Sequence, residues 1–258
     1  MELSKDSNKS ISSLQRSFKY FLDNSPIPQI KENNECHLII DGTYFSDTCL
    51  LDYLDNGLKY LQYYSLVKRE CYESYLIDLS LLKESGLNVV SITSDGQKGL
   101  IKAVGEIFPN IVHQRCIIHI QRMSLIYLTR FPKTKAGMEL RKLVTYLHEI
   151  DDHEKRDIWI KLFSEWYKKY HNFLQEKSES ITGRKWYTHK LLRRTRSLIK
   201  NALPNMFHYL DNPNIPKSTN ALETRFSYLK NNIRIHRGLS RSNRKGFIMW
   251  YNYFKNQD

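Results

Sequence analysis

Two aspartates occur where buried strands are expected to leave a sheet, and carboxylates at such positions can hold a divalent cation. Asp41 follows the apolar residues Leu38–Ile40, and Asp95 follows the mostly β-branched run Asn88–Thr93. Ligands of open α/β sheets gather beyond the carboxyl ends of the strands. Two neighbouring carboxylates repel each other, and their hard oxygen atoms suit Mg²⁺ or Mn²⁺. We therefore expect a metal site where these two strands end.

A third carboxylate would complete a site for phosphodiester chemistry on two metal ions. The candidate is Glu223, in the sequence STNALETR that begins at Ser218. Each acid also has an ordinary structural interpretation. Asn220 and Glu223 have the spacing of a helix capping box, and both aspartates precede a glycine, which makes a favoured turn dipeptide.

The elements that must position these acids follow from the hydrophobic pattern. With 258 residues, of which 41% are hydrophobic, the chain can form a substantial core. Spacing of the apolar residues predicts strands at His37–Phe45, Leu58–Val67, Asn88–Thr93 and Ile111–Ile118, and helices at Glu70–Lys83 and Gln97–Phe108. Strand–helix–strand units require a parallel pairing reached through a right-handed crossover.

The middle of the chain has a different pattern, in which apolar residues recur at helical spacing. Asp151 and Glu154 have the spacing of a capping box within it. A loop follows at Asp211–Pro216, and a last helix is predicted from Ser218 to about Ile233. We therefore divide the chain into a polar tail or the remnant of a preceding domain (1–36), the first part of a core (37–120), a helical insertion (121–215) and the last part of the core with a basic C-terminus (216–258).

The net positive charge lies entirely in the C-terminal third of the chain. Residues 183–258 hold sixteen Lys and Arg against three acids, whereas the remainder holds 24 basic and 24 acidic residues. Such asymmetry indicates a polyanionic partner, most simply a nucleic acid; a charge that only maintains solubility is the alternative. The expected phosphate contacts are Arg193, Arg194, Arg196, Lys200, Arg225, Lys230, Arg234, Arg237, Arg241 and Arg244, with Trp186, Tyr187 and His236 able to stack on unpaired bases.

The sequence contains neither an apolar run long enough to span a membrane nor a signal-peptide pattern at its start. Its four cysteines form no Cys-x-x-Cys pair, so a disulfide scaffold is not expected. We predict a cytoplasmic protein that associates with the nucleoid and not with a membrane.

Four motifs occur in order: DGTYF from Asp41; SDGQKGL from Ser94, with Phe-Pro at 108–109; RCIIHIQR from Arg115; and STNALE from Ser218, with Leu-Lys at 229–230 and Gly-Leu at 238–239. Together they resemble the DDE transposases of the Mutator type and of related bacterial insertion sequences. The resemblance covers about residues 37–240. Each motif alone is weak, but their order, with a helical insertion before the last, is specific.

The resemblance implies an α/β protein with an RNase H-like core, a mixed five-stranded sheet flanked by helices, and an all-helical insertion before the last catalytic helix. It implies that Asp41, Asp95 and Glu223 are catalytic and hold two Mg²⁺ (or Mn²⁺) ions about 3.5–4 Å apart. DNA would be cleaved at transposon ends, and the freed 3′-OH would attack target DNA. The partners would be transposon ends, target DNA and a second copy of the chain, at least on DNA.

Cys116 and His119 form the Cys-x-x-His of the third motif. Both are good zinc ligands, but no second pair has matching spacing, so a closed structural zinc site is not expected. The resemblance places the pair on a strand near the active site, in a supporting role.

Relatives in this family carry a DNA-binding region before the first strand, whereas only about 36 residues precede it here. We expect a truncated or decayed element, or a second protein that supplies end recognition. Two other functions stay open: a non-catalytic DNA-binding protein derived from a transposase, and an RNase H-like nuclease of the resolvase or ribonuclease type.

Overall fold

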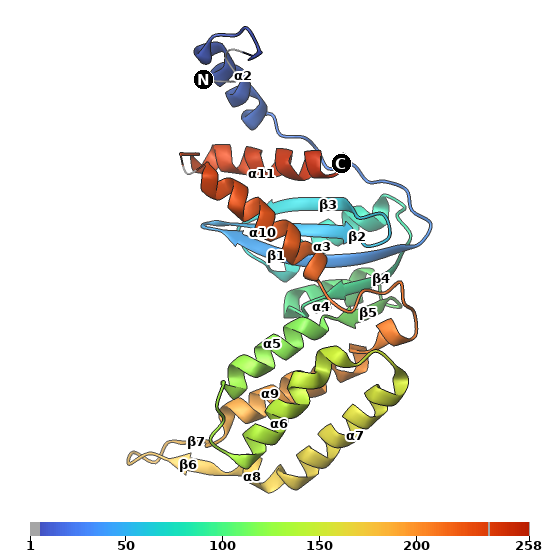
Figure 1. Cartoon of the computed structure of the whole chain (residues 1–258), viewed down its shortest axis with the longest axis vertical. Coiled ribbons are helices and arrows are strands. Elements are labelled where there is room, and N and C mark those ends of the chain that lie inside the picture. The colour runs from blue at the N-terminus through green and yellow to red at the C-terminus, as the bar shows by residue number, and fades with distance from the viewer. Residues whose placement is uncertain (1–5, 237, 258) are drawn as a thin grey trace.

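The computed structural model describes residues 6–236 and 238–257. It has a central sheet with helices on both faces, an elongated helical insertion beyond one end of the sheet, and an N-terminal helix at the opposite end of the molecule (Figure 1). None of the described helices combines the length and the apolar character needed to cross a membrane.

The sheet has five strands in the spatial order β3-β2-β1-β4-β5. The strands are β1 (Cys36–Phe45), β2 (Thr48–Asp55), β3 (Tyr60–Val67), β4 (Val89–Ser94) and β5 (Val112–Arg115). β2 is antiparallel to β1 and β3, whereas β4 is parallel to β1 and to β5. The predicted α/β fold with an RNase H-like core is therefore confirmed. β2 had not been predicted.

Each face of the sheet is covered by its own pair of helices. α3 (Tyr72–Glu84) and α4 (Lys98–Ile107) bury Leu79, Leu82 and Leu100 against one face. α10 (Asn220–Ile235) and α11 (Arg241–Lys255) cover the other face and bury a further set of apolar side chains. The sequence pattern had predicted α10 but not α11.

The insertion has a hydrophobic core that is separate from those of the sheet. Its helices are α5 (Ile117–Leu128), α6 (Lys135–Thr145), α7 (His153–Lys169), α8 (His171–Gln175) and α9 (Lys190–Ala202), with 3₁₀ turns at Tyr146–Glu149, Leu203–Asn205 and His208–Leu210. It is not entirely helical as expected, because β6 (Lys177–Glu179) and β7 (Lys185–Tyr187) form an antiparallel hairpin. The cap of α7 also differs from the prediction, since Asp152, not Asp151, accepts from the Lys155 N–H.

The N-terminal segment is not only a polar tail. Helix α2 (Ile11–Asp23) begins at the Ser10 cap, whose hydroxyl accepts from the Ser13 N–H. It lies against α11, where the absence of a side chain at Gly246 allows the Leu22 backbone to approach closely. The Trp250 indole N–H donates to the Phe21 carbonyl at 2.7 Å.

Candidate metal centre at the edge of the sheet

Asp41 and Asp95 are brought together by the parallel pairing of β1 and β4. The last paired residues of that ladder are Ile40 and Ser94. Asp41 and Asp95 are the next residues on their respective strands, so both half-buried acids lie at one edge of the sheet. The sequence had led us to expect that Asp41 and Asp95 lie close together, and the register of the two strands explains why they do.

The two Asp-Gly dipeptides serve different purposes. Asp95 does form a turn: its Oδ1 accepts from the Gln97 N–H at 2.8 Å, and Gly96 has a φ of 84°. A turn at Asp41 is the wrong interpretation, because β1 continues to Phe45. The absence of a side chain at Gly42 lets the end of the Glu70 side chain lie against this part of β1.

Glu223 reaches the same edge because the segment before α10 is tied to the sheet and to α5. Thr93 Oγ1 donates to the Pro216 carbonyl at 2.9 Å, and the Ile117 N–H donates to the Lys217 carbonyl at 3.0 Å. The capping-box interpretation of Glu223 is wrong. α10 has no side-chain cap, and the carboxylate of Glu223 points away from the start of its own helix toward α5.

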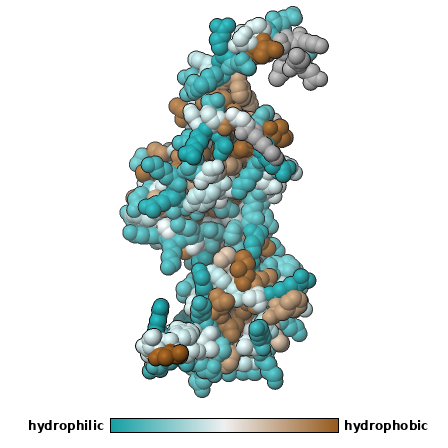
Figure 2. All heavy atoms as spheres, turned by 90° about the vertical axis from the view of Figure 1, so that its left-hand side faces the viewer, coloured by the Kyte–Doolittle hydropathy of each residue, from teal (hydrophilic) through white to brown (hydrophobic). Residues whose placement is uncertain are grey.

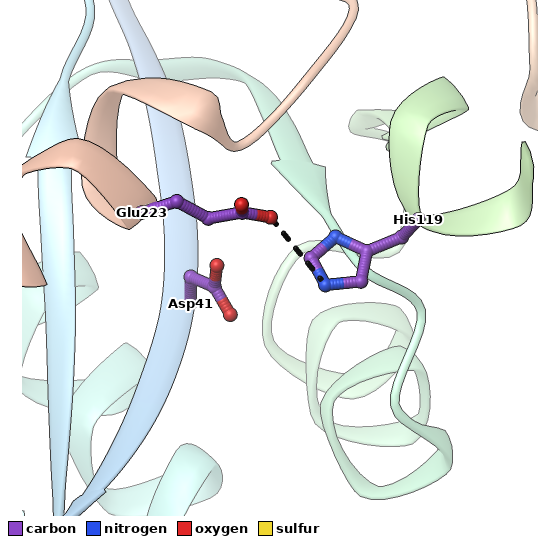
Figure 3. A group of neighbouring side chains, drawn as sticks. All are labelled: Asp41, His119 and Glu223. Carbon is purple, nitrogen blue, oxygen red and sulfur yellow. Dashed lines mark ion pairs between the residues drawn. The ribbon is translucent and has the colours of Figure 1, made fainter. Parts of the chain in front are cut away.

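Asp41, His119 and Glu223 form the group of described residues whose geometry could hold a metal ion. One ligand atom from each lies within 4.8 Å of the others. His119 Nε2 is 3.7 Å from Glu223 Oε1, and Asp41 lies beside this pair (Figure 3). The group lines a hollow of about 470 Å³ that Lys230 also lines. Asp95 is not a member of the group, although its charge acts on Asp41 and His119.

Cys116 and His119 lie at the start of a helix, not on a strand as expected. β5 ends at Arg115, and Cys116 is the cap residue of α5. The buried Cys116 sulfur accepts from the N–H groups of His119 at 3.5 Å and Thr219 at 3.4 Å. It is not in the metal-binding group of the described residues. Its visible role is to join α5 to the start of α10.

The surroundings of His119 favour its protonated form. Its hydrogen bond with the Cys116 sulfur, followed by the nearby negative charges of Asp41 and Asp95, raises the pKa of His119 to about 9. Burial raises the pKa of the Cys116 thiol, but the hydrogen bond and charge of His119 outweigh this and bring that pKa below its usual value.

Arg122 is a site residue that sequence reasoning missed. It lies on α5 three positions after His119, and its guanidinium donates to both oxygens of Glu223 at 3.1 Å each. Residues three apart share a face of a helix. The signal was present in RCIIHIQR, but it could be recognised only if that segment was taken as a helix.

Glu70 is a second residue that was missed. It lies before α3, where its Oε1 accepts from the Cys49 thiol at 3.5 Å and lies against Gly42. Burial, and then the negative charge of Asp95, raises the pKa of Glu70. Nothing in the local sequence marks it, because its position depends on how α3 packs against the sheet.

The donor set fits a hard divalent cation. Burial raises the pKa of the Asp41 carboxyl to about 7, and Asp95 adds to this rise while His119 opposes it. A cation bound among these acids would offset the charge that burial disfavours. Carboxylate oxygens are the ligands that Mg²⁺ and Mn²⁺ prefer.

The described basic residues predicted to contact phosphate lie on three helices. Arg241 and Arg244 lie on α11, where Arg241 is 3.8 Å from Asp47 and Arg244 donates to Ser46 Oγ at 3.1 Å. Lys230 and Arg234 are exposed on α10, and Lys230 lines the hollow beside Glu223. Arg193, Arg194, Arg196 and Lys200 lie on α9 of the insertion, where the three arginines lie over the rings of Tyr187, Tyr127 and Tyr167 at 3.5, 4.4 and 4.0 Å. Arg237 lies outside the described residues.

Arg225 is not placed to contact phosphate, contrary to the prediction. Its guanidinium nitrogens Nε and Nη2 are buried, and its charge acts on the buried Asp52 of β2. Burial lowers the pKa of Arg225, and Asp52 opposes this. The residue therefore belongs to the interface between α10 and the sheet.

The sequence pattern of the family described as "Transposase, Mutator family" matches residues 55–188, just over half of the chain. The chain belongs to this family. The chain is 32% identical over 102 residues to the transposase for insertion sequence element IS905 of Lactococcus lactis subsp. lactis (strain IL1403). The matched segment is 35% of this chain and 26% of that protein. The transposase for ISRM5 of Rhizobium meliloti (strain 1021) is 30% identical over 127 residues, 48% of this chain and 31% of that protein.

The chain thus matches less than a third of the length of these two relatives. A solved cryo-EM structure of the simian T-cell lymphotropic virus intasome in complex with the PP2A regulatory subunit B56 gamma matches with 12% identity and a TM-score of 0.25. It covers 68% of this chain and 52% of the other. A likeness of that size carries no argument, and the fold assignment rests on the sheet topology alone.

Proposed function

We propose that this chain is the catalytic part of an insertion-sequence transposase, with Asp41, Asp95 and Glu223 as the residues that hold two Mg²⁺ or Mn²⁺ ions. The observation that supports this most strongly is the convergence of Asp41 with Glu223, which is far away in the sequence. Asp95 is the next acid along the same sheet edge. Membership of the transposase family supports the same assignment.

The reaction is two successive phosphoryl transfers. A water oxygen attacks phosphorus at the transposon end, and the bond to the 3′ oxygen breaks to leave a 3′-OH and a 5′-phosphate. That 3′-OH then attacks a phosphorus of target DNA, and a new 3′-OH leaves. When bound, divalent ions lower the pKa of the attacking group and stabilise the leaving oxygen.

The protein side chains around the hollow would position the DNA. Lys230 is exposed at its rim and would neutralise a phosphate next to the scissile bond. Arg122 holds Glu223 by two hydrogen bonds and would be free to contact a phosphate if Glu223 turned to a cation. His119, positively charged between Asp41 and Glu223, would keep the two acids oriented.

The partners follow from the proposed reaction. Two transposon ends must be joined to one target, so we expect two copies of the chain to act together, at least on DNA. The concentration of positive charge in residues 183–258 supports binding of DNA.

A strand-transfer assay with Mn²⁺ tests the assignment. The substrates are precut oligonucleotides from both flanks of the gene and a supercoiled target plasmid. We expect Asp41→Asn, Asp95→Asn and Glu223→Gln each to lower joining by at least about 100-fold, as for a metal ligand. Asp47→Asn, an exposed acid on the turn after β1, is the control.

Each other outcome has a definite meaning. Full joining by Asp95→Asn would remove Asp95 from the metal site. DNA binding without any metal-dependent cleavage by the unaltered chain would identify a DNA-binding relic. Cleavage without joining would identify a nuclease.

A further inference from the structure

A second hollow, of about 420 Å³, opens in the insertion, between the loop that joins α5 to α6 and the start of α9. Its walls include the rings of Tyr127 and Phe131, and Lys133 and Lys190 lie at its edge. None of the described residues that line it is acidic. Figure 2 shows that this end of the molecule carries hydrophobic side chains set among hydrophilic ones.

The aromatic rings of this hollow are held by arginines. Arg194 of α9 lies over the Tyr127 ring at 4.4 Å, which fixes that ring between two helices. Phe131 is 78% exposed, and the Arg130 guanidinium lies 5.4 Å from its ring centroid. Because the Phe131 ring is this exposed, it adds little to the core and can contact a ligand in the hollow that it lines.

The loop that presents Phe131 is held in an unusual conformation. Thr129 has a φ of 62°, a value that a β-branched residue rarely adopts. The Arg141 guanidinium donates to its carbonyl at 2.8 Å and holds the turn in place. Such backbone strain persists where surrounding contacts impose it, and it is concentrated at ligand-binding sites.

Helix α5 connects this hollow with the candidate metal centre. His119 and Arg122 lie at its first turns, and Tyr127 lies near its end. Eight residues separate His119 from Tyr127, which corresponds to about 12 Å along a helix. Stacked nucleotides are about 3.4 Å apart along one strand, so the two sites are about three to four nucleotides apart.

We propose that this hollow binds one unstacked base of the DNA strand held at the metal centre, three to four nucleotides from the scissile phosphate. The base stacks on the Phe131 ring next to Tyr127, while Lys133 and Lys190 neutralise the flanking phosphates. Aromatic rings with a cationic rim suit this ligand, because every base has a face that can stack. The proposal rests on the proposed function for the position of the DNA strand.

The test uses the full chain without divalent metal, so that no cleavage occurs. The probes are duplexes with a 3′ single-stranded overhang of one to six nucleotides, in which 2-aminopurine replaces one base at a time. We expect quenching of the 2-aminopurine fluorescence at the third or fourth position. Phe131→Ala abolishes that quenching and lowers affinity for the longer overhangs about 10- to 100-fold, with little effect on blunt duplex.

Two further variants make the result specific to stacking. Phe131→Trp retains a larger aromatic ring and is expected to preserve both quenching and affinity. Ile181→Ala removes an even more exposed apolar side chain from the tip of the β6–β7 hairpin and is expected to change neither. Since Phe131 is exposed, its replacement leaves the core of the insertion intact.

Several results would overturn the proposal. They are equal loss of affinity for overhang and blunt DNA in Phe131→Ala, unchanged quenching in that variant, or quenching spread evenly over all six positions. Failure of the proposed function is measured separately, as the absence of Mn²⁺-dependent joining by the unaltered chain. A chain that stacks the base but joins no DNA would retain this site and lose the catalytic assignment.

Discussion

The guanidinium of Arg122 donates hydrogen bonds to both carboxylate oxygens of Glu223, at 3.1 Å each. Those oxygens are the ones that a cation shared with Asp41 would need. A cation bound there would therefore compete with the Arg122 guanidinium for the Glu223 carboxylate.

This competition predicts tighter metal binding when Arg122 is removed. Arg122→Gln is expected to strengthen Mn²⁺ binding to the DNA-free protein by about three- to tenfold, since a charge-assisted pair at a half-exposed site contributes modestly. Titration calorimetry with Mn²⁺ measures it. Arg241→Gln, which breaks an exposed pair with Asp47, is the matched control. Weaker binding by Arg122→Gln would show that Arg122 supports the metal site.

Phosphate neutralisation by Lys230 predicts a change in salt dependence. Lys230→Gln is expected to reduce the slope of log K against log salt concentration by about 0.9 for duplex DNA, because one fewer counterion is released. Fluorescence anisotropy at several salt concentrations gives the slope. Lys161→Gln, on the exposed face of α7, should leave it unchanged. Equal slopes for Lys230→Gln and the unaltered chain would place Lys230 outside the DNA interface.

The raised pKa of the buried Asp78 carboxyl is expected to make the free energy of unfolding depend on pH. Burial raises the pKa of its carboxyl to about 6, although hydroxyl donors from Ser65 and Tyr53 oppose the rise. Between about pH 4 and pH 6 the folded chain holds a proton that the unfolded chain has released, so the contribution of Asp78 to stability falls as pH rises. Asp78→Asn should remove this part of the pH dependence, on the order of 1 kcal/mol.

Urea unfolding at pH 4.5 and pH 7 tests this, with the loss of stability between the two values compared in the variant and the unaltered chain. Asp157→Asn, an acid exposed on α7, is the control. A variant that loses as much stability as the unaltered chain would show that Asp78 is ionised throughout this range.

The separate core of the insertion predicts a strong effect of Trp166. Its indole N–H donates to the Ala136 carbonyl at 2.9 Å, and its ring stacks on Phe163 with centroids 6.0 Å apart. Trp166→Ala is expected to cost about 3–5 kcal/mol of unfolding free energy. Trp186→Ala, at 45% exposed on the hairpin, should cost far less. Circular dichroism during urea unfolding compares them, and equal losses would contradict the assigned core.

Strands β1 and β4 and helix α4 could be predicted because their apolar residues follow one simple period. β2 could not. It contains Asp52 and Asp55, residue types that strands disfavour, and only tertiary contacts make them acceptable. Asp52 accepts from the Asn252 amide at 3.0 Å, and Asp55 accepts from the N–H groups of the following turn.

For the candidate site, acid type and strand position were enough to select Asp41 and Asp95, and the motif order selected Glu223. Arg122 was missed because the helix start at Cys116 follows the strand without an intervening loop, so the change of period from strand to helix is abrupt. Glu70 was missed because its proximity to Gly42 is set by packing between distant segments.

Two hydrogen bonds hold the end of the insertion next to the sheet and the start of α5. The Thr93 hydroxyl donates to the Pro216 carbonyl, and the Ile117 N–H donates to the Lys217 carbonyl. The entropy of closing a flexible loop grows only with the logarithm of its length, about 0.6 kcal/mol for each doubling. The position of Glu223 opposite Asp41 therefore depends on where the chain rejoins the sheet, and not on the length of the insertion. Domains of quite different length could be accommodated there during evolution while Glu223 stayed opposite Asp41.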